Sequence, residues 1–230
     1  MRALRILLIT AVILGGLFTI ADRLAVNYAE GEAADRIRAN QGLTGSADVS
    51  IKGFPFLTQV MGKELDQVDV TLTGVEASAG GRKVRVTEMN AALQRVRLEN
   101  NFSRAVAASA SGTARISYAD LGKASEEDVT VGYGGNGKVK VTGSIEIPVL
   151  GKVTRSVLSS VSLAGDDTIR VHADKVPGEG LPGVEERIRE RTDFDRQVGG
   201  LPTGLKLQKV EATPEGVVVT VTGTNVVLTG

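Results

Sequence analysis

The sequence predicts an α+β protein built around a long antiparallel sheet, and three observations support this fold class. Apolar and polar residues alternate through most of the chain after residue 43, which is typical of strands with one buried and one solvated face. Turn signals containing Gly, Asn or Pro separate the alternating segments. Helical patterns are confined to the N-terminal region and to short segments, so the sheet must bury its apolar face on a few helices or on itself.

The N-terminus has the pattern of a secretory signal. Two basic residues, Arg2 and Arg5, precede an uncharged apolar segment, 6–21. Thr19 and Ala21 are small residues at the spacing of a cleavage site. The length of the apolar segment 6–21, however, approaches that of a membrane-spanning helix. Two alternatives therefore stay open for residues 1–21: a cleaved signal peptide or a retained signal anchor. Both place the rest of the chain outside the cytoplasm, because the arginines stay inside.

The segment after the apolar stretch, 22–39, is rich in Ala, Glu and Arg. It predicts a modestly amphipathic helix that continues from the apolar segment. Leu24, Tyr28, Ala34 and Ile37 are expected near one face of this helix.

The remainder alternates with a period of two and shows no shift in composition, so residues 22–230 are expected to form a single domain. Asn136-Gly137 predicts a two-residue hairpin turn, because both residues tolerate positive φ. Three short helices are expected at 56–62, 118–125 and 183–191. The apolar positions of the predicted strands are Val68, Val70 and Leu72; Val84 and Val86; Val96 and Leu98; Val139, Val141, Ile145 and Ile147; Ile169, Val171 and Ala173; and Val217, Val219 and Val221.

The composition argues against several classes of function. The 27 basic residues equal the 27 acidic ones in number, so the chain lacks the basic footprint of a nucleic-acid-binding protein. Aromatic residues make up only 3% and Trp is absent, which disfavours stacking platforms for single-stranded nucleic acid. With no Cys, the chain has no disulfide, no thiolate metal site and no Cys nucleophile.

Motifs with catalytic potential have simpler explanations. Residues 132–138 match most of a phosphate-binding loop, but Val139 replaces the required Ser or Thr and the loop opens a strand. A hairpin turn explains it better. His172, the only histidine, lies on the polar face of a predicted strand, and one His cannot make a multi-histidine metal site. The sequence predicts no catalytic residue, no metal site and no cofactor.

The most aromatic stretch of the chain contains the candidate residues for lipid or membrane contact. These are Phe54, Phe56, Leu57, Val60 and Met61. If the stretch is exposed, it forms an apolar tip suited to a bilayer surface. If it is buried, it is ordinary core, which its composition alone favours.

The same stretch resembles the LmeA-like phospholipid-binding proteins of the actinobacterial cell envelope. The Gly-Phe-Pro-Phe-Leu-Thr block is its most specific part, and Asp22-Arg23-Leu24 agrees as well. The similar segments are residues 49–60, 62–63, 65–70, 201–205 and 210–217. The resemblance implies a long curved sheet wrapped around a few helices, similar to tubular lipid-binding folds, with an apolar interior for acyl chains. It also implies phospholipid binding without catalysis, and a link to glycolipid maturation.

The leading hypothesis is therefore a non-enzymatic protein that binds or carries phospholipid or a related amphiphile in the cell envelope. It would be membrane-anchored or secreted, with lipid and the membrane surface as partners and no nucleic acid. The alternative is a structural or adaptor protein that positions an envelope enzyme, with an exposed apolar patch for that protein partner. An enzyme acting on envelope lipids ranks third, because the sequence shows no clustered acid–base set.

Overall fold

The computed structural model describes residues 2–41, 45–79, 82–100, 103–125, 129–147, 151–175 and 193–229. Within these ranges the chain forms three helices and eleven strands. The helices are α1 (Arg2–Gln41), α2 (Phe56–Gly62) and α3 (Tyr118–Ala124). The strands are β1 (Ala47–Lys52), β2 (Glu64–Ala79), β3 (Arg82–Glu99), β4 (Arg104–Ile116), β5 (Val129–Gly135), β6 (Lys138–Ile147), β7 (Gly151–Leu163), β8 (Thr168–Lys175), β9 (Phe194–Gln197), β10 (Leu205–Thr213) and β11 (Gly216–Thr229).

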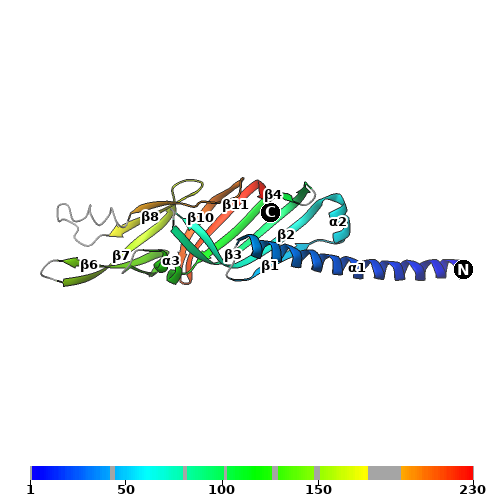
Figure 1. Cartoon of the computed structure of the whole chain (residues 1–230), viewed down its shortest axis with the longest axis horizontal. Helices are drawn as coiled ribbons and strands as arrows, with labels where there is room; N and C mark the ends of the chain where they lie inside the picture. The colour runs from blue at the N-terminus through cyan, green and yellow to red at the C-terminus, as the bar shows by residue number, and fades with distance from the viewer. Residues whose placement is uncertain are drawn as a thin grey trace.

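The strands pair into two antiparallel sheets, which confirms the predicted fold class. Sheet A has six strands in the order β1-β2-β3-β4-β11-β10, and sheet B has five in the order β5-β6-β7-β8-β9. The molecule is elongated, with sheet B at one end and the N-terminal part of α1 projecting from the other (Figure 1). The C-terminal hairpin returns to sheet A, where β11 lies between β4 and β10.

Local sequence signals account for the short elements. Asn136 and Gly137 take φ values of 51° and 71° between β5 and β6, as the predicted hairpin turn requires. Both α2 and α3 lie where short helices were expected. The Ser117 hydroxyl caps α3 by accepting a hydrogen bond from the Asp120 N–H at 3.1 Å. The third short helix, predicted at 183–191, lies outside the described residues.

The buried face of α1 differs from the predicted one. Ala34 is buried and Ile37 packs against the core, but Leu24 and Tyr28 lie on the opposite side and are exposed. The prediction grouped all four residues on one face, and for Leu24 and Tyr28 it was wrong. The face that packs is built mainly from small residues, which let the helix approach the sheet closely: Ala25, Val26, Ala29, Ala33 and Ala34.

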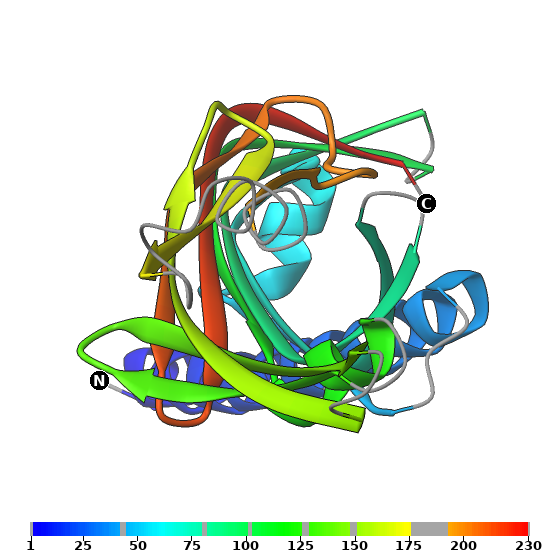
Figure 2. The same cartoon turned by 90° about the vertical axis from the view of Figure 1, so that its left-hand side faces the viewer.

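A first hydrophobic core joins α1 and α2 to sheet A. Seen along the molecule, sheet A is strongly curved and α2 lies across its far end (Figure 2). The strict alternation of the strands shifts phase in this part of the sheet, where Arg95 and Asn225 have positive φ. As a result, each of the strands β2, β3 and β4 turns two residues that are three positions apart toward the helices. These pairs are Leu65 and Val68, Leu93 and Val96, and Ala107 and Ala110.

A second core joins sheet B to sheet A. Val139 of sheet B packs with buried residues of β10 and β11, and Tyr118 and Leu121 of α3 cover the same cluster. The backbone also connects the two sheets, since the Leu207 N–H donates to the Asp166 carbonyl at 2.7 Å. The described chain therefore has two main hydrophobic clusters, the first near α2 and the second near sheet B, and a small third one formed by Val157 and Ala173 of sheet B.

Candidate functional site

Most of the exposed large hydrophobic residues of the described chain lie in the N-terminal half of α1. Its large side chains between Leu4 and Ile20 are exposed. Among the described residues, this is the one helix long and apolar enough to cross a membrane. A helix of this kind near an N-terminus fits a signal sequence or a membrane anchor equally.

The segment that follows β1 turns sharply into α2. Gly53 takes a φ of 96°, and a Cβ at this position would collide with the side chains of Asp66 and Gln59. Glycine is therefore required here. Gln59 then joins the two neighbouring strands, because its Oε1 accepts the Asp66 N–H at 2.8 Å and its Nε2 donates to the Lys52 carbonyl at 3.4 Å.

The structure separates the five candidate residues for lipid or membrane contact. Phe56 is only 7% exposed and belongs to the first core. Leu57 and Val60 are half-buried and pack against that core. Phe54 and Met61 are 58% and 85% exposed. Two of the five thus present apolar surface to the outside, and three fasten α2 to the sheet.

Asp22 connects α1 directly to α2. Its side chain is fully buried, and its Oδ1 accepts a hydrogen bond from the Leu57 N–H at 2.8 Å. The carboxylate thereby satisfies an amide of the first turn of α2, which has no partner within the helix. Pro55, the residue that precedes α2, provides no side-chain cap. Asp22 serves as that cap from a distant part of the chain.

Arg23 extends this connection to Phe54. Its guanidinium donates to Asp22 Oδ2 at 2.7 Å and lies 5.2 Å from the centroid of the Phe54 ring, within range of a cation–π interaction. Phe54 is consequently held beside the point where the apolar segment of α1 ends. Nothing in the pattern around Asp22 and Arg23 predicts their contacts, because their partners lie more than thirty residues away.

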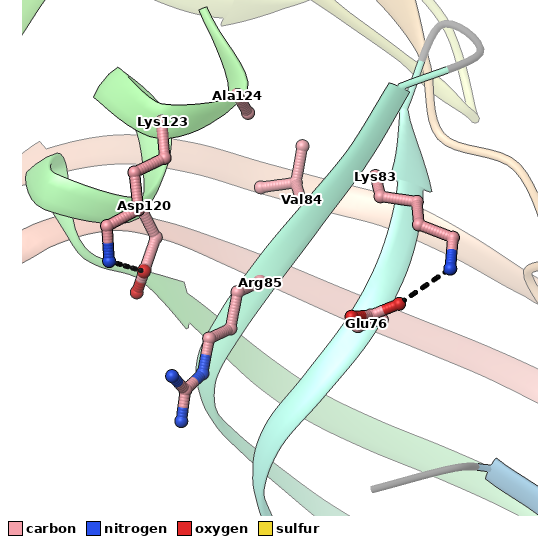
Figure 3. A pocket seen from close by; sticks show the side chains of 7 residues that line it. All are labelled: Glu76, Lys83, Val84, Arg85, Asp120, Lys123 and Ala124. Atoms are coloured by element: carbon pink, nitrogen blue, oxygen red, sulfur yellow. Dashed lines mark hydrogen bonds and ion pairs between the residues drawn. The ribbon is translucent and has the colours of Figure 1, made fainter. Parts of the chain in front are cut away.

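Two pockets of the described chain are shallow and lined mainly by charged residues. The first, of about 170 Å³, lies between α3 and the β2–β3 hairpin. Val84 lies among charged residues there, with Glu76 paired to Lys83 and Asp120 paired to Lys123 (Figure 3). The second is about 380 Å³ and is lined by Glu64, Arg95, Arg97 and Ala108. Neither is an apolar cavity of the kind that encloses a lipid tail.

The chain's one histidine contacts an acid. His172 is exposed, and its Nδ1 lies 2.7 Å from Asp193 Oδ2. A nucleophilic triad would also need a hydroxyl or thiol on the other ring nitrogen, and among the described residues the ring has no such contact. The same residues contain no group of three or more His, Cys, Asp or Glu that could hold a metal ion.

Comparison with known proteins identifies the family. A family model described as LmeA-like phospholipid-binding matches residues 20–222. No curated protein and no solved structure matches the chain. The match begins two residues before Asp22 and includes α2, all of β1 to β10 and the first half of β11. The chain therefore belongs to the LmeA-like phospholipid-binding family.

Proposed function

We propose that this protein binds phospholipid or a related amphiphile at a membrane surface outside the cytoplasm and carries it without altering it chemically. One observation supports this most strongly. Phe54, just before α2, and Met61, within α2, expose apolar surface, and α2 lies at the end of the domain from which the apolar helix emerges (Figure 1). The family to which the chain belongs points to the same class of ligand.

Acyl chains would bind by separating the packed interior at the α2 end. In this proposal the lipid tail contacts the first core beneath α2, because the two described pockets are lined mainly by charged residues. Helix α2 has only seven residues, and Phe56 is its one buried residue. Moving α2 would uncover this core, and each methylene buried there would contribute about 0.8 kcal/mol.

The test uses the full-length protein in donor liposomes that contain a fluorescent phospholipid, with unlabelled acceptor liposomes. We expect phospholipid to move to the acceptor and to be recovered intact. The double variant Phe54→Ser with Met61→Ser should slow transfer while the fold persists. Leu158→Ser, which removes an exposed apolar residue from sheet B, should leave transfer unchanged. Equal slowing by both variants, or no transfer at all, would contradict the proposal.

The family resemblance extends the proposal to a pathway. We propose that the carried amphiphile supports glycolipid maturation in the cell envelope. Deleting the gene should then change the size distribution of envelope glycolipids, and the full-length protein should restore it. The Phe54→Ser, Met61→Ser variant should restore it less. Full restoration by this variant would show that glycolipid maturation does not depend on lipid transfer by this protein.

An adaptor that positions an envelope enzyme is the second candidate, favoured by the packed interior of the described chain. It predicts that exposed apolar surface binds a protein instead of lipid. In the transfer assay an adaptor would move no lipid. It would still restore glycolipid maturation in cells, so the two assays together separate the candidates.

A further inference from the structure

The membrane-crossing segment and the folded domain share one uninterrupted helix. Helix α1 runs from Arg2 to Gln41, and its exposed apolar part ends where Asp22, a fully buried residue, begins the packed part. Residues 19–21, which suit a cleavage site, therefore lie inside regular helix. Cleavage after Ala21 would place Asp22 in the first turn of a shortened helix, and helix ends fray.

Among the described residues, three side-chain hydrogen bonds between Asp22 and Arg38 fasten the packed part of α1 to the rest of the domain. Asp22 accepts the Leu57 N–H, as described above. Glu30 Oε1 accepts the Ile51 N–H at 2.7 Å. Arg38 donates to the Ala47 carbonyl at 2.9 Å. The last two bonds satisfy backbone groups of β1, the edge strand of sheet A. Because the fastening is spread over four turns or more, the direction of α1 is fixed relative to sheet A.

The length of the apolar part of α1 places Leu24 and Tyr28 at a bilayer surface. The uncharged apolar stretch from Ile6 to Ala21 spans about 24 Å as a helix. Leu4 and the aliphatic stem of Arg5, whose charged end reaches the membrane surface, extend it toward the roughly 30 Å of a bilayer's hydrocarbon core. Leu24 and Tyr28 then lie about 5 and 10 Å beyond Ala21 along the helix axis. These positions fall in the headgroup layer, where Tyr is enriched. Phe54 is held at the same level by Arg23.

We propose that residues 3–21 are retained as a membrane span and that a membrane-facing surface, formed by Leu24, Tyr28, Phe54 and Met61, rests in the headgroup layer of the same phospholipid bilayer. All four side chains are large, apolar or aromatic, and exposed. The bilayer is the partner of these side chains, because a membrane-spanning α1 places this end of the domain next to it. Sheet B then points away from the membrane (Figure 1). This inference goes beyond the proposed function, since it fixes the geometry whether or not lipid is carried.

Retention is tested on the full-length chain, expressed with its own N-terminus and recovered from membranes of the host. Intact mass should include residues 1–21, and alkaline extraction should leave the protein in the membrane fraction. A mature chain that begins at Asp22 and is released into the soluble fraction would overturn the inference.

Depth is tested with tryptophan, which the natural chain lacks. The single-tryptophan variants Phe54→Trp, Tyr28→Trp and Leu158→Trp are reconstituted in vesicles of phosphatidylcholine and phosphatidylglycerol that carry a nitroxide quencher on the lipid headgroup. The headgroup quencher should quench the fluorescence of a tryptophan at position 54 or 28, whereas a tryptophan at position 158, on sheet B, should stay unquenched. Equal quenching at all three positions, or none at positions 28 and 54, would overturn the inference.

The same vesicles separate this inference from the proposed function. Lipid transfer without quenching at position 54 would refute the membrane-facing surface and leave carriage intact. Quenching at position 54 without any transfer would support the membrane-facing surface and refute carriage.

Discussion

Asp22 accepts a hydrogen bond from the backbone N–H of Leu57 at 2.8 Å, although 35 residues separate the two in sequence. Asp22 is the first charged residue after the apolar segment, and Leu57 lies in the first turn of α2. This one contact couples the helix that leaves the domain to the helix that covers the end of sheet A. Its strength therefore bears on how easily α2 moves.

Asp22→Ala should loosen α2. The variant leaves the Leu57 amide without its acceptor, and losing one buried hydrogen bond should speed amide exchange in residues 56–62 on the order of tenfold. Hydrogen exchange followed by mass spectrometry measures this directly. Arg23→Ala is the matched control, because it keeps the Asp22 acceptor and should have a smaller effect. Unchanged exchange in Asp22→Ala would show that the contact does not hold α2.

Truncation of Phe56 should destabilise the fold much more than truncation of Phe54. Phe56→Ala removes a buried ring from the first core and should cost about 3–5 kcal/mol of unfolding free energy. Phe54→Ala loses mainly the contact with Arg23 and should cost about 0.5–1 kcal/mol. Urea unfolding followed by circular dichroism gives both values. Similar losses for the two variants would place Phe54 in the core as well.

Asp120 should contribute stability that depends on pH. The hydrogen bond from Ser117, at 2.7 Å, is the main cause that lowers the pKa of Asp120 below its ordinary 3.8, and Lys123 adds to it against the opposing effect of burial. The ionised carboxylate therefore stabilises the fold at every pH above this ordinary value. That contribution is lost as the pH falls through the lower pKa of the folded state.

Asp120→Asn should remove this pH dependence. The variant should be less stable than the natural protein at neutral pH, and the difference should shrink as the pH is lowered to about 3. Urea midpoints over a pH series measure it. A constant difference at all pH values would attribute the loss to packing and not to the charge.

His172→Ala should leave lipid transfer unchanged. The ring is exposed and pairs with the Asp193 carboxylate, and exposed substitutions of this kind usually change stability by less than about 0.5 kcal/mol. The transferred phospholipid should be chemically identical before and after incubation, by mass spectrometry. Altered lipid that depends on His172 would instead reveal catalysis.

Much of the fold follows from local patterns. The alternation around Val68, Val139 and Val217 predicted strands, and all three residues are buried in strands of the sheets. Asn136-Gly137 predicted its turn because the required positive φ depends on two adjacent residues. The span of α2 was predicted from its own segment. Such signals need no knowledge of distant parts of the chain.

The sequence did not show how the strands divide into two sheets, nor that β11 lies between β4 and β10. A half-apolar strand has the same pattern whichever neighbour it pairs with, so the pattern cannot name the partner. The exposed position of Leu24 and Tyr28 was missed for a related reason. The buried face of α1 is made largely of alanines, which give a weak periodic signal.

By itself, then, the sequence determined the fold class, the apolar N-terminal segment and the block around Phe54 as the region of interest. Only the tertiary structure decided that Phe54 is exposed while Phe56, two residues on, is buried, and that Asp22 caps α2. Strand alternation and turn chemistry are set between near neighbours along the chain. Burial and long-range hydrogen bonds are set by which surfaces meet when the chain closes on itself, and no single segment contains that information.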